Sequence, residues 1–231
     1  MSKPIDIKIA QFTKPENLEQ SIDRSLVWEI FQKNNNEVLK HFIKFQQTWV
    51  NQAYAVFRDF DTYLVLIYLI NKVFLNLSDR FHYMSFESFY GQEKLSIDKI
   101  NLIEISKDLN IPKETIRRKV NFLQDQGIIY REGKSIFLNV PKISIQKPIT
   151  SIGLLATCLA NFSNILSSQT WFGDKIRQET IVKFIQDHFT VSWEYFFRFQ
   201  IPYLVRHRTF FGDLESWNVW GSIALVQMRE L

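Results

Sequence analysis

The stretch from residue 100 to residue 138 constrains the fold most, because helical and extended patterns succeed one another within it. In its first half, apolar residues recur at i, i+3 and i+7, the spacing of one face of a short helix: Leu102, Ile105 and Leu109. Asn101 precedes this run and is a residue type that caps helices. Pro112 follows Asn110 and Ile111 and ends the helix, because the residue before a proline is disfavoured in the α region. The pattern predicts a short helix followed by a tight turn.

A second helix is predicted from about Lys113, because Pro112 suits a first helical turn and the apolar period then resumes. Its apolar face is formed by three residues: Ile116, Val120 and Leu123. Gly127 supplies a left-handed stop. At 100° per residue, four polar side chains fall opposite the apolar face: Glu114, Arg117, Arg118 and Asn121. The helix would pack on a partner with one face and present arginines and an asparagine on the other.

The residues that follow, 128–138, have the pattern of a β-hairpin. Two extended runs are joined by Glu132 and Gly133, and Gly133 supplies the positive φ that a tight turn needs. Arg131 and Lys134 flank this turn, so the hairpin would carry two cations at its tip.

Helix, turn, helix and hairpin in this order resemble the winged helix-turn-helix of bacterial transcription regulators, over roughly residues 60 to 140. The residues that carry the resemblance are Ile105-Ser106, Leu109, Ile111-Pro112, Glu114-Thr115-Ile116-Arg117-Arg118, Val120, Leu123 and Gly127-Ile128. By position, the resemblance implies groove-reading residues at Lys113, Glu114, Thr115, Arg117, Arg118 and Asn121, and wing contacts at Arg131 and Lys134. The second helix would enter the major groove, where arginine recognises guanine and asparagine recognises adenine.

The sequence departs from the family pattern in two ways. The wing is short, and Pro112 stands where the family often has a serine or threonine cap, so a capping or phosphate hydrogen bond is expected to be missing. The charged face also has a plain structural interpretation. Glu114 and Arg118 are four residues apart and would form an ordinary surface pair. Arg117 and Lys119 would then only keep the helix soluble.

Charge distribution favours DNA contact only locally. The whole chain carries +4, and a net +3 of this falls between Pro112 and Lys134. A weakly basic chain without a polybasic tail permits nucleic-acid binding without indicating it.

The composition predicts a mainly α protein. The 231 residues include 21 Phe, 6 Trp and 8 Tyr but only 7 Gly and 6 Pro, which leaves little material for turns and favours long helices. The single cysteine, Cys158, lies in an apolar run, and the four histidines are scattered without metal-ligand spacing. We find no nucleophile, phosphate-loop or metal motif, so neither an enzyme nor a cofactor or metal is expected.

The chain is expected to be cytoplasmic and to have no membrane partner. Its first ten residues are polar and lack the apolar core of a secretory signal. The most apolar run, 63–77, contains Asn71 and Lys72 and is shorter than a bilayer requires.

Residues 1–60 are predicted to form an arm, 1–16, and two helices, 18–33 and 37–59, as a segment that could dimerise. The second helix carries an apolar stripe that must lie against another long helix, in this chain or in a second copy: Val38, Phe42, Phe45, Trp49, Ala53, Val56 and Phe60. The DNA-binding domain would span 61–140.

Within that domain, 61–80 reads as a helix buried in the centre. Residues 81–99 would hold a short helical turn, either as packing or as a lid over a ligand pocket. A linker is predicted at 141–150, because it contains two prolines and no helical period.

A C-terminal helical domain, 151–231, would serve dimerisation or effector binding. It should contain helices at 151–168, 174–199 and 213–231, the last capped by Asp213. Their aromatic residues would form a plain core or line a pocket for an apolar effector. The connection before the last helix holds a basic cluster that would bind an anionic effector or DNA phosphates, or form a solvated loop: Arg206, His207 and Arg208.

The sequence thus predicts a mainly α protein with a central winged helix-turn-helix flanked by N- and C-terminal helices. It would act as a homodimeric, sequence-specific regulator of transcription on double-stranded DNA. Two alternatives stay open. One is a protein-docking module that contacts its partner through Phe122 and the wing. The other is a regulator that senses a small molecule through its C-terminal aromatics, which a sizeable enclosed apolar cavity there would support and a solid core would exclude.

Overall fold

The computed structural model describes residues 23–80, 82–97, 100–133, 135–144, 148–168 and 173–228. This part is mainly helical, with one small three-stranded antiparallel sheet, so the predicted mainly α class is confirmed. The elements follow in the order α1 Arg24–Lys33, α2 Asn35–Phe57, α3 Phe60–Asp79, α4 Phe86–Tyr90, β1 Lys94–Ile97, α5 Leu102–Leu109, α6 Lys113–Asp125, β2 Ile129–Glu132, β3 Ser135–Asn139, α7 Val140–Ser144, α8 Pro148–Leu166, α9 Gln178–Asp187, α10 Phe189–Phe211 and α11 Leu214–Gln227. The predicted arm, 1–16, lies outside the described residues, as do 18–22 of the first predicted helix.

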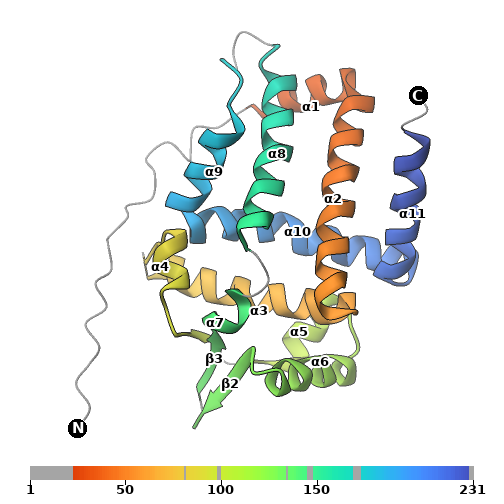
Figure 1. Cartoon of the computed structure of the whole chain (residues 1–231). Helices are drawn as coiled ribbons and strands as arrows, with labels where there is room; N and C mark the ends of the chain where they lie inside the picture. Colours follow the sequence, from red (N-terminus) through yellow and green to blue (C-terminus); the bar gives the residue numbers. More distant parts are fainter. Residues whose placement is uncertain are drawn as a thin grey trace.

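The helix α3 forms the centre of the molecule, as predicted for 61–80. Figure 1 shows α5, α6 and the strands on one side of it, and α10 with the helices α1, α2, α8, α9 and α11 on the other. By length and composition alone, α3 is apolar enough to cross a membrane, although the apolar run read from the sequence is shorter. In this fold most of its side chains are buried.

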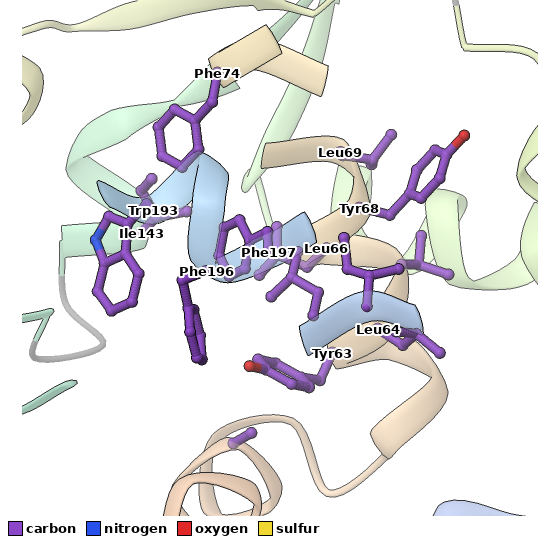
Figure 2. Close-up of a cluster of buried hydrophobic side chains, with 14 of the residues drawn as sticks. Tyr63, Leu64, Leu66, Tyr68, Leu69, Phe74, Ile143, Trp193, Phe196 and Phe197 are labelled. Atoms are coloured by element: carbon purple, nitrogen blue, oxygen red, sulfur yellow. The ribbon is translucent and has the colours of Figure 1, made fainter. Parts of the chain in front are cut away.

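A seam of aromatic rings joins α3 to α10. Phe74 of α3 stacks on Phe197 of α10 with centroids 6.0 Å apart, and Phe197 stacks in turn on Trp193 at 5.9 Å. Figure 2 shows this cluster, in which side chains from the two helices are gathered with Ile143 of α7. Burial of such rings dominates core energetics, so the seam connects the two sides of the molecule through one hydrophobic core.

The strand β1 was not predicted from the sequence. It lies within 81–99, where the predicted helical turn is α4, and it pairs with β3 to give the sheet order β1-β3-β2. Its four residues alternate exposed and buried side chains, with Leu95 and Ile97 facing the core. An alternation of four residues is too short to predict a strand from the sequence. Residues 94–97 form a strand because they pair with the otherwise free edge of β3.

The predicted linker 141–150 is wrong in part. Val140–Ser144 form α7, whose Ile143 is buried, and α8 already begins at Pro148. Both prolines of this segment occupy first helical turns, where the missing N–H has no partner to lose. Prolines that suggested a linker therefore mark helix starts.

The prediction of one helix over 174–199 is also wrong. His188, with φ −118° and ψ 45°, separates α9 from α10, and α10 continues through Pro202 to Phe211. A proline inside a helix costs about 3 kcal/mol. Burial of the neighbouring Ile201 and Leu204 offsets that cost. The basic cluster Arg206–Arg208 therefore lies on a helix and not in a loop.

The apolar stripe of α2 lies against helices of this chain. Phe45, Trp49 and Ala53 are buried where α2 packs on α8, α11 and α3, whereas Val56 is 50 % exposed. Among these apolar contacts, the side-chain amides of Gln46 of α2 and Gln200 of α10 donate hydrogen bonds to each other, both at 2.9 Å. The intrachain alternative for the stripe is thereby confirmed for its central part.

Candidate nucleic-acid interface

The two predicted short helices are α5 and α6. The Asn101 side chain caps α5 by accepting from the backbone N–H of Ile103 at 3.1 Å and of Glu104 at 3.4 Å, as predicted. The turn places Asn110 in the left-handed region, with φ 52°. Ile111 is buried in the turn, and its carbonyl accepts from the Ser106 hydroxyl at 2.6 Å. A short turn with a buried isoleucine thus connects two helices whose apolar faces meet.

The helix α6 buries the predicted face and exposes the predicted polar face. Ile116, Val120 and Leu123 are all buried. The candidate contact residues are exposed except for the half-buried Thr115: Lys113, Glu114, Thr115, Arg117, Arg118 and Asn121. Pro112 provides no side-chain cap, as expected, and Gly127 has the predicted positive φ of 67° after the helix.

Glu114 pairs with Arg117, not with Arg118 as the plain surface interpretation predicted. The Arg117 guanidinium donates through Nε at 3.1 Å and through Nη2 at 2.5 Å. These hydrogen bonds hold the pKa of the Glu114 carboxyl below its usual value. Arg118 forms no ion pair with any described residue, and its Nη2 lies 3.4 Å from the Thr115 hydroxyl. On this face Arg118 is therefore available to a ligand, whereas Arg117 is engaged.

Lys119 does not simply keep α6 soluble. Its ammonium points away from the solvent face and pairs with Asp59, the N-cap of α3, which also accepts from the Thr62 amide at 2.8 Å. Burial by itself would raise the pKa of Asp59, but the hydrogen bonds from Lys119 and Thr62 lower it below its ordinary value. The pair clamps α6 to the start of the central helix.

Arg208 of the basic cluster also has a structural role that the sequence did not reveal. Its Nε donates to Asp61 Oδ1 at 2.8 Å, and its Nη1 donates to the Asn110 carbonyl at 2.9 Å. The Asn110 amide donates in turn to the Thr209 hydroxyl at 3.0 Å. The end of α10 therefore holds the turn between α5 and α6. No local pattern signals a contact between residues so far apart in the chain.

The predicted hairpin is formed by β2 and β3, and Gly133 has the expected positive φ of 60°. Arg131 is exposed near the tip and forms no ion pair with the rest of the described chain, while Lys134 lies outside the described residues. Glu132 pairs with Lys94 of β1 at 2.6 Å, and the Lys94 ammonium lies 4.8 Å from the centre of the Phe137 ring. The Glu132 carboxylate near the hairpin tip is thus neutralised by Lys94 of the same sheet.

The arrangement is suited to binding rather than to holding a metal ion. In the parts of the chain that are described, no three His, Cys, Asp or Glu side chains lie close enough together to hold an ion. Exposed Lys113, Arg118, Asn121 and Arg131 instead offer hydrogen-bond donors over one helix face and the adjoining sheet tip. Comparisons of the chain with models of protein families, with curated proteins and with solved structures found no match.

Proposed function

We propose that this chain is a sequence-specific regulator of transcription that binds double-stranded DNA as a homodimer in the cytoplasm. The helix α6 would read the major groove, and the hairpin 128–138 would grip the adjacent backbone as a wing. One observation carries the proposal: Arg118 and Asn121 are exposed near the centre of the polar face of α6, and Arg118 forms no ion pair within the described residues. These two side-chain types recognise guanine and adenine edges bidentately.

The order of the elements supports a winged helix-turn-helix. The chain passes from the buried α3 through β1 to α5 and α6 and then into the β2–β3 hairpin. The strand β1 pairs with β3 and gives the hairpin a third strand, which ties it to the helices by buried Leu95 and Ile97. A wing supported in this way would be held in a fixed orientation beside α6.

The rigidity of α6 supports the same proposal. The Lys119–Asp59 ion pair clamps its middle, and Arg208 holds the turn before it. A recognition element that is pre-ordered loses less conformational freedom on binding, and this favours specificity. The two cations thus serve the proposed site without touching the ligand.

The helix α11 supports a homodimer. It is apolar on both sides: Trp217 is buried inside, whereas an outer stripe with helical spacing is more than half exposed. The stripe consists of Val219, Ile223 and Val226. A two-fold arrangement through this stripe would place two copies of α6 on two half-sites, as helix-turn-helix dimers require.

Selection from random duplex DNA with the purified chain tests the proposal. We expect enrichment of an inverted repeat by the unmodified chain and its loss in the double variant Arg118→Ala/Asn121→Ala. The variant Lys183→Ala is the matched control, because it removes a cation that is 80 % exposed on α9. Selection with no enriched sequence, and residual binding that only falls with salt, would overturn the proposal.

A protein-docking module is the second candidate, and two observations favour it. The Glu114–Arg117 and Lys94–Glu132 pairs neutralise part of the positive surface, and Phe122 of α6 is 41 % exposed. On this alternative, Phe122→Ala would abolish binding to the partner, whereas Arg118→Ala would leave it unchanged. A selection that enriches no DNA sequence would support the protein-docking alternative.

A further inference from the structure

A large apolar cavity lies on the side of α3 opposite to α6. It opens between α1, α2, α8, α9 and the first half of α10 and has a volume of about 690 Å³. Cavities that hold small molecules in proteins span roughly 300–1,000 Å³. The lining consists of Trp28, Phe31, Val38, Phe42, Phe45, Leu155, Cys158, Leu159, Phe162, Ile181, Phe184, Ile185, Val191, Ser192, Tyr195, Phe196 and Phe199.

The lining defines the chemistry of what the cavity can accept. None of the described lining residues has a charged side chain, and nine of them are aromatic. Burial raises the pKa of the Cys158 thiol to about 12, so this group is neutral at physiological pH. A charged ligand would lose its hydration here without gaining a partner, and the cavity therefore excludes ions.

One polar group in the lining lacks a partner. The Ser192 hydroxyl is shielded from solvent and makes no hydrogen bond with any described residue. Buried polar groups in folded proteins are nearly always hydrogen-bonded, and each exception calls for a physical reason. The hydroxyl oxygen is closed off from the cavity space as well as from solvent, so Ser192 contributes only apolar surface to the lining.

The mouth of the cavity leaves large apolar side chains uncovered. Trp28 is 64 % exposed, Phe199 46 %, Tyr195 44 %, and Leu159 and Phe184 41 % each. Contiguous exposed apolar surface of this kind is rare on monomeric proteins and marks binding sites. The inner wall, by contrast, is closed by buried Phe45, Cys158 and Phe196, which gives the site a depth that a flat docking face lacks.

We propose that this cavity binds a small, uncharged, largely apolar molecule, and that the molecule acts as an effector of the DNA-binding helix. The effector role rests on the proposed function, but the binding site does not. The ligand would be of the aromatic or branched aliphatic class, because rings form most of the wall.

The helix α10 provides the physical connection between the two sites. Ser192, Phe196 and Phe199 line the cavity on its first half, and Arg208 and Thr209 hold Asn110 in the turn before α6 from its other end. A ligand that shifts or stiffens α10 would therefore change how the turn is held. Coupling of this kind requires that the ligand bind the two arrangements of the helix with different affinity.

Fluorescence titration of the full chain with N-phenyl-1-naphthylamine, an uncharged apolar probe, tests the binding site. We expect saturable binding with one probe per chain. Leu159→Lys places a charge at the mouth and should weaken binding by about tenfold or more. Leu39→Lys is the matched control, because Leu39 is 37 % exposed and does not line the cavity, and it should bind like the unmodified chain.

Three results would overturn the inference. Probe uptake without saturation, or an equal loss in Leu159→Lys and Leu39→Lys, would mean that no defined site exists. A Leu159→Lys variant that changes oligomeric state in analytical ultracentrifugation would assign the face to a second copy of the chain.

The effector role is tested on the DNA that the selection enriches. We expect saturating probe to change the affinity for that DNA at least about threefold in the unmodified chain but not in Leu159→Lys. Unchanged affinity would overturn the effector role. Failure of the selection itself would count against DNA binding, and the probe titration would still decide the site.

Discussion

The exposed face of α6 and the aromatic cavity differ in nearly every physical property. The α6 face is polar, convex and formed by residues that follow one another within 113–121. The cavity is apolar, concave and assembled from five helices that range from Trp28 to Phe199. A site on one helix is determined by local periodicity, whereas a site between helices exists only once the helices have packed. The comparison explains why the sequence located the first site by residue and left the second only as an alternative to a plain aromatic core.

The two regions nevertheless belong to one core. The seam of Phe74, Phe197 and Trp193 joins the central helix α3, which supports α6, to α10, which lines the cavity. Arg208 adds a polar connection at the other end of α10. Changes in this seam should therefore affect both regions at once.

The largest effect is expected from Phe74→Ala, because Phe74 belongs to the core that both regions share. Phe74 is 2 % exposed, so the truncation should lower the free energy of unfolding by about 3–5 kcal/mol. Chemical denaturation followed by tryptophan fluorescence and by circular dichroism measures this. Phe210→Ala is the control, because Phe210 is 81 % exposed and its loss should change stability by less than about 0.5 kcal/mol. Two separate transitions, only one of them shifted, would show that the regions are independent.

The next effect concerns the candidate DNA contacts and distinguishes Arg118 on the polar face of α6 from Arg131 on β2 of the hairpin. Arg118→Ala should cost about 1–3 kcal/mol of binding to the selected DNA and relax specificity at one base pair. Arg131→Ala should weaken binding evenly across sequences and reduce the salt slope by about 1. Titrations of labelled duplexes at several salt concentrations measure both. Equal effects of the two variants on all sequences would contradict base reading by α6.

A pH effect is expected where α6 is clamped to α3. The folded-state pKa of Asp59 lies below its unfolded value of 3.8. The stabilisation is therefore fully present above that unfolded value and is lost as the pH falls through the lower folded pKa. Asp59→Asn retains a cap but removes the charge, and it should cost about 1 kcal/mol at neutral pH. Chemical denaturation between pH 2 and pH 7 measures the free energy of unfolding of both chains. Their difference should vanish at the acid end. A difference that persists there would contradict a stabilising role of the Asp59 charge.

The smallest effect is expected in the cavity. Ser192→Ala removes a buried hydroxyl that has no partner, so stability should be unchanged or rise by up to about 1 kcal/mol. Thermal denaturation without ligand measures this. A clear loss of stability would indicate that the hydroxyl already has a partner in the free protein.

Much of the fold could be predicted wherever residues close together in the chain determine the structure. The caps Asn101 and Asp213, the stop at Gly127 and the turn at Gly133 follow from local backbone chemistry and were read correctly. The prolines misled, because Pro141 and Pro148 stand in first helical turns, where the missing N–H costs little, and Pro202 is accommodated inside α10 beside the buried Ile201. Intrinsic helix propensity predicts structure only weakly, and the burial of side chains in the folded protein can override it.

The candidate polar face was predictable because α6 alone defines it, but its electrostatics were not. The sequence suggested a Glu114–Arg118 pair, whereas Glu114 pairs with Arg117 at the equally local i,i+3 spacing, and the packing of α6 on α3 draws Lys119 to Asp59. Ion pairs depend on distances of a few ångström between side chains, which no spacing rule specifies across elements.

The amino-acid sequence by itself determined the helical class, the α5–α6–hairpin order and the polar face of α6, because each follows from periodicity, capping and turn chemistry within a few residues. Only the tertiary structure decided the β1 edge, the Arg208 contact with Asn110 and the aromatic cavity. These features join residues far apart in the chain, and they form only when burial of the α3–α10 core brings their helices together.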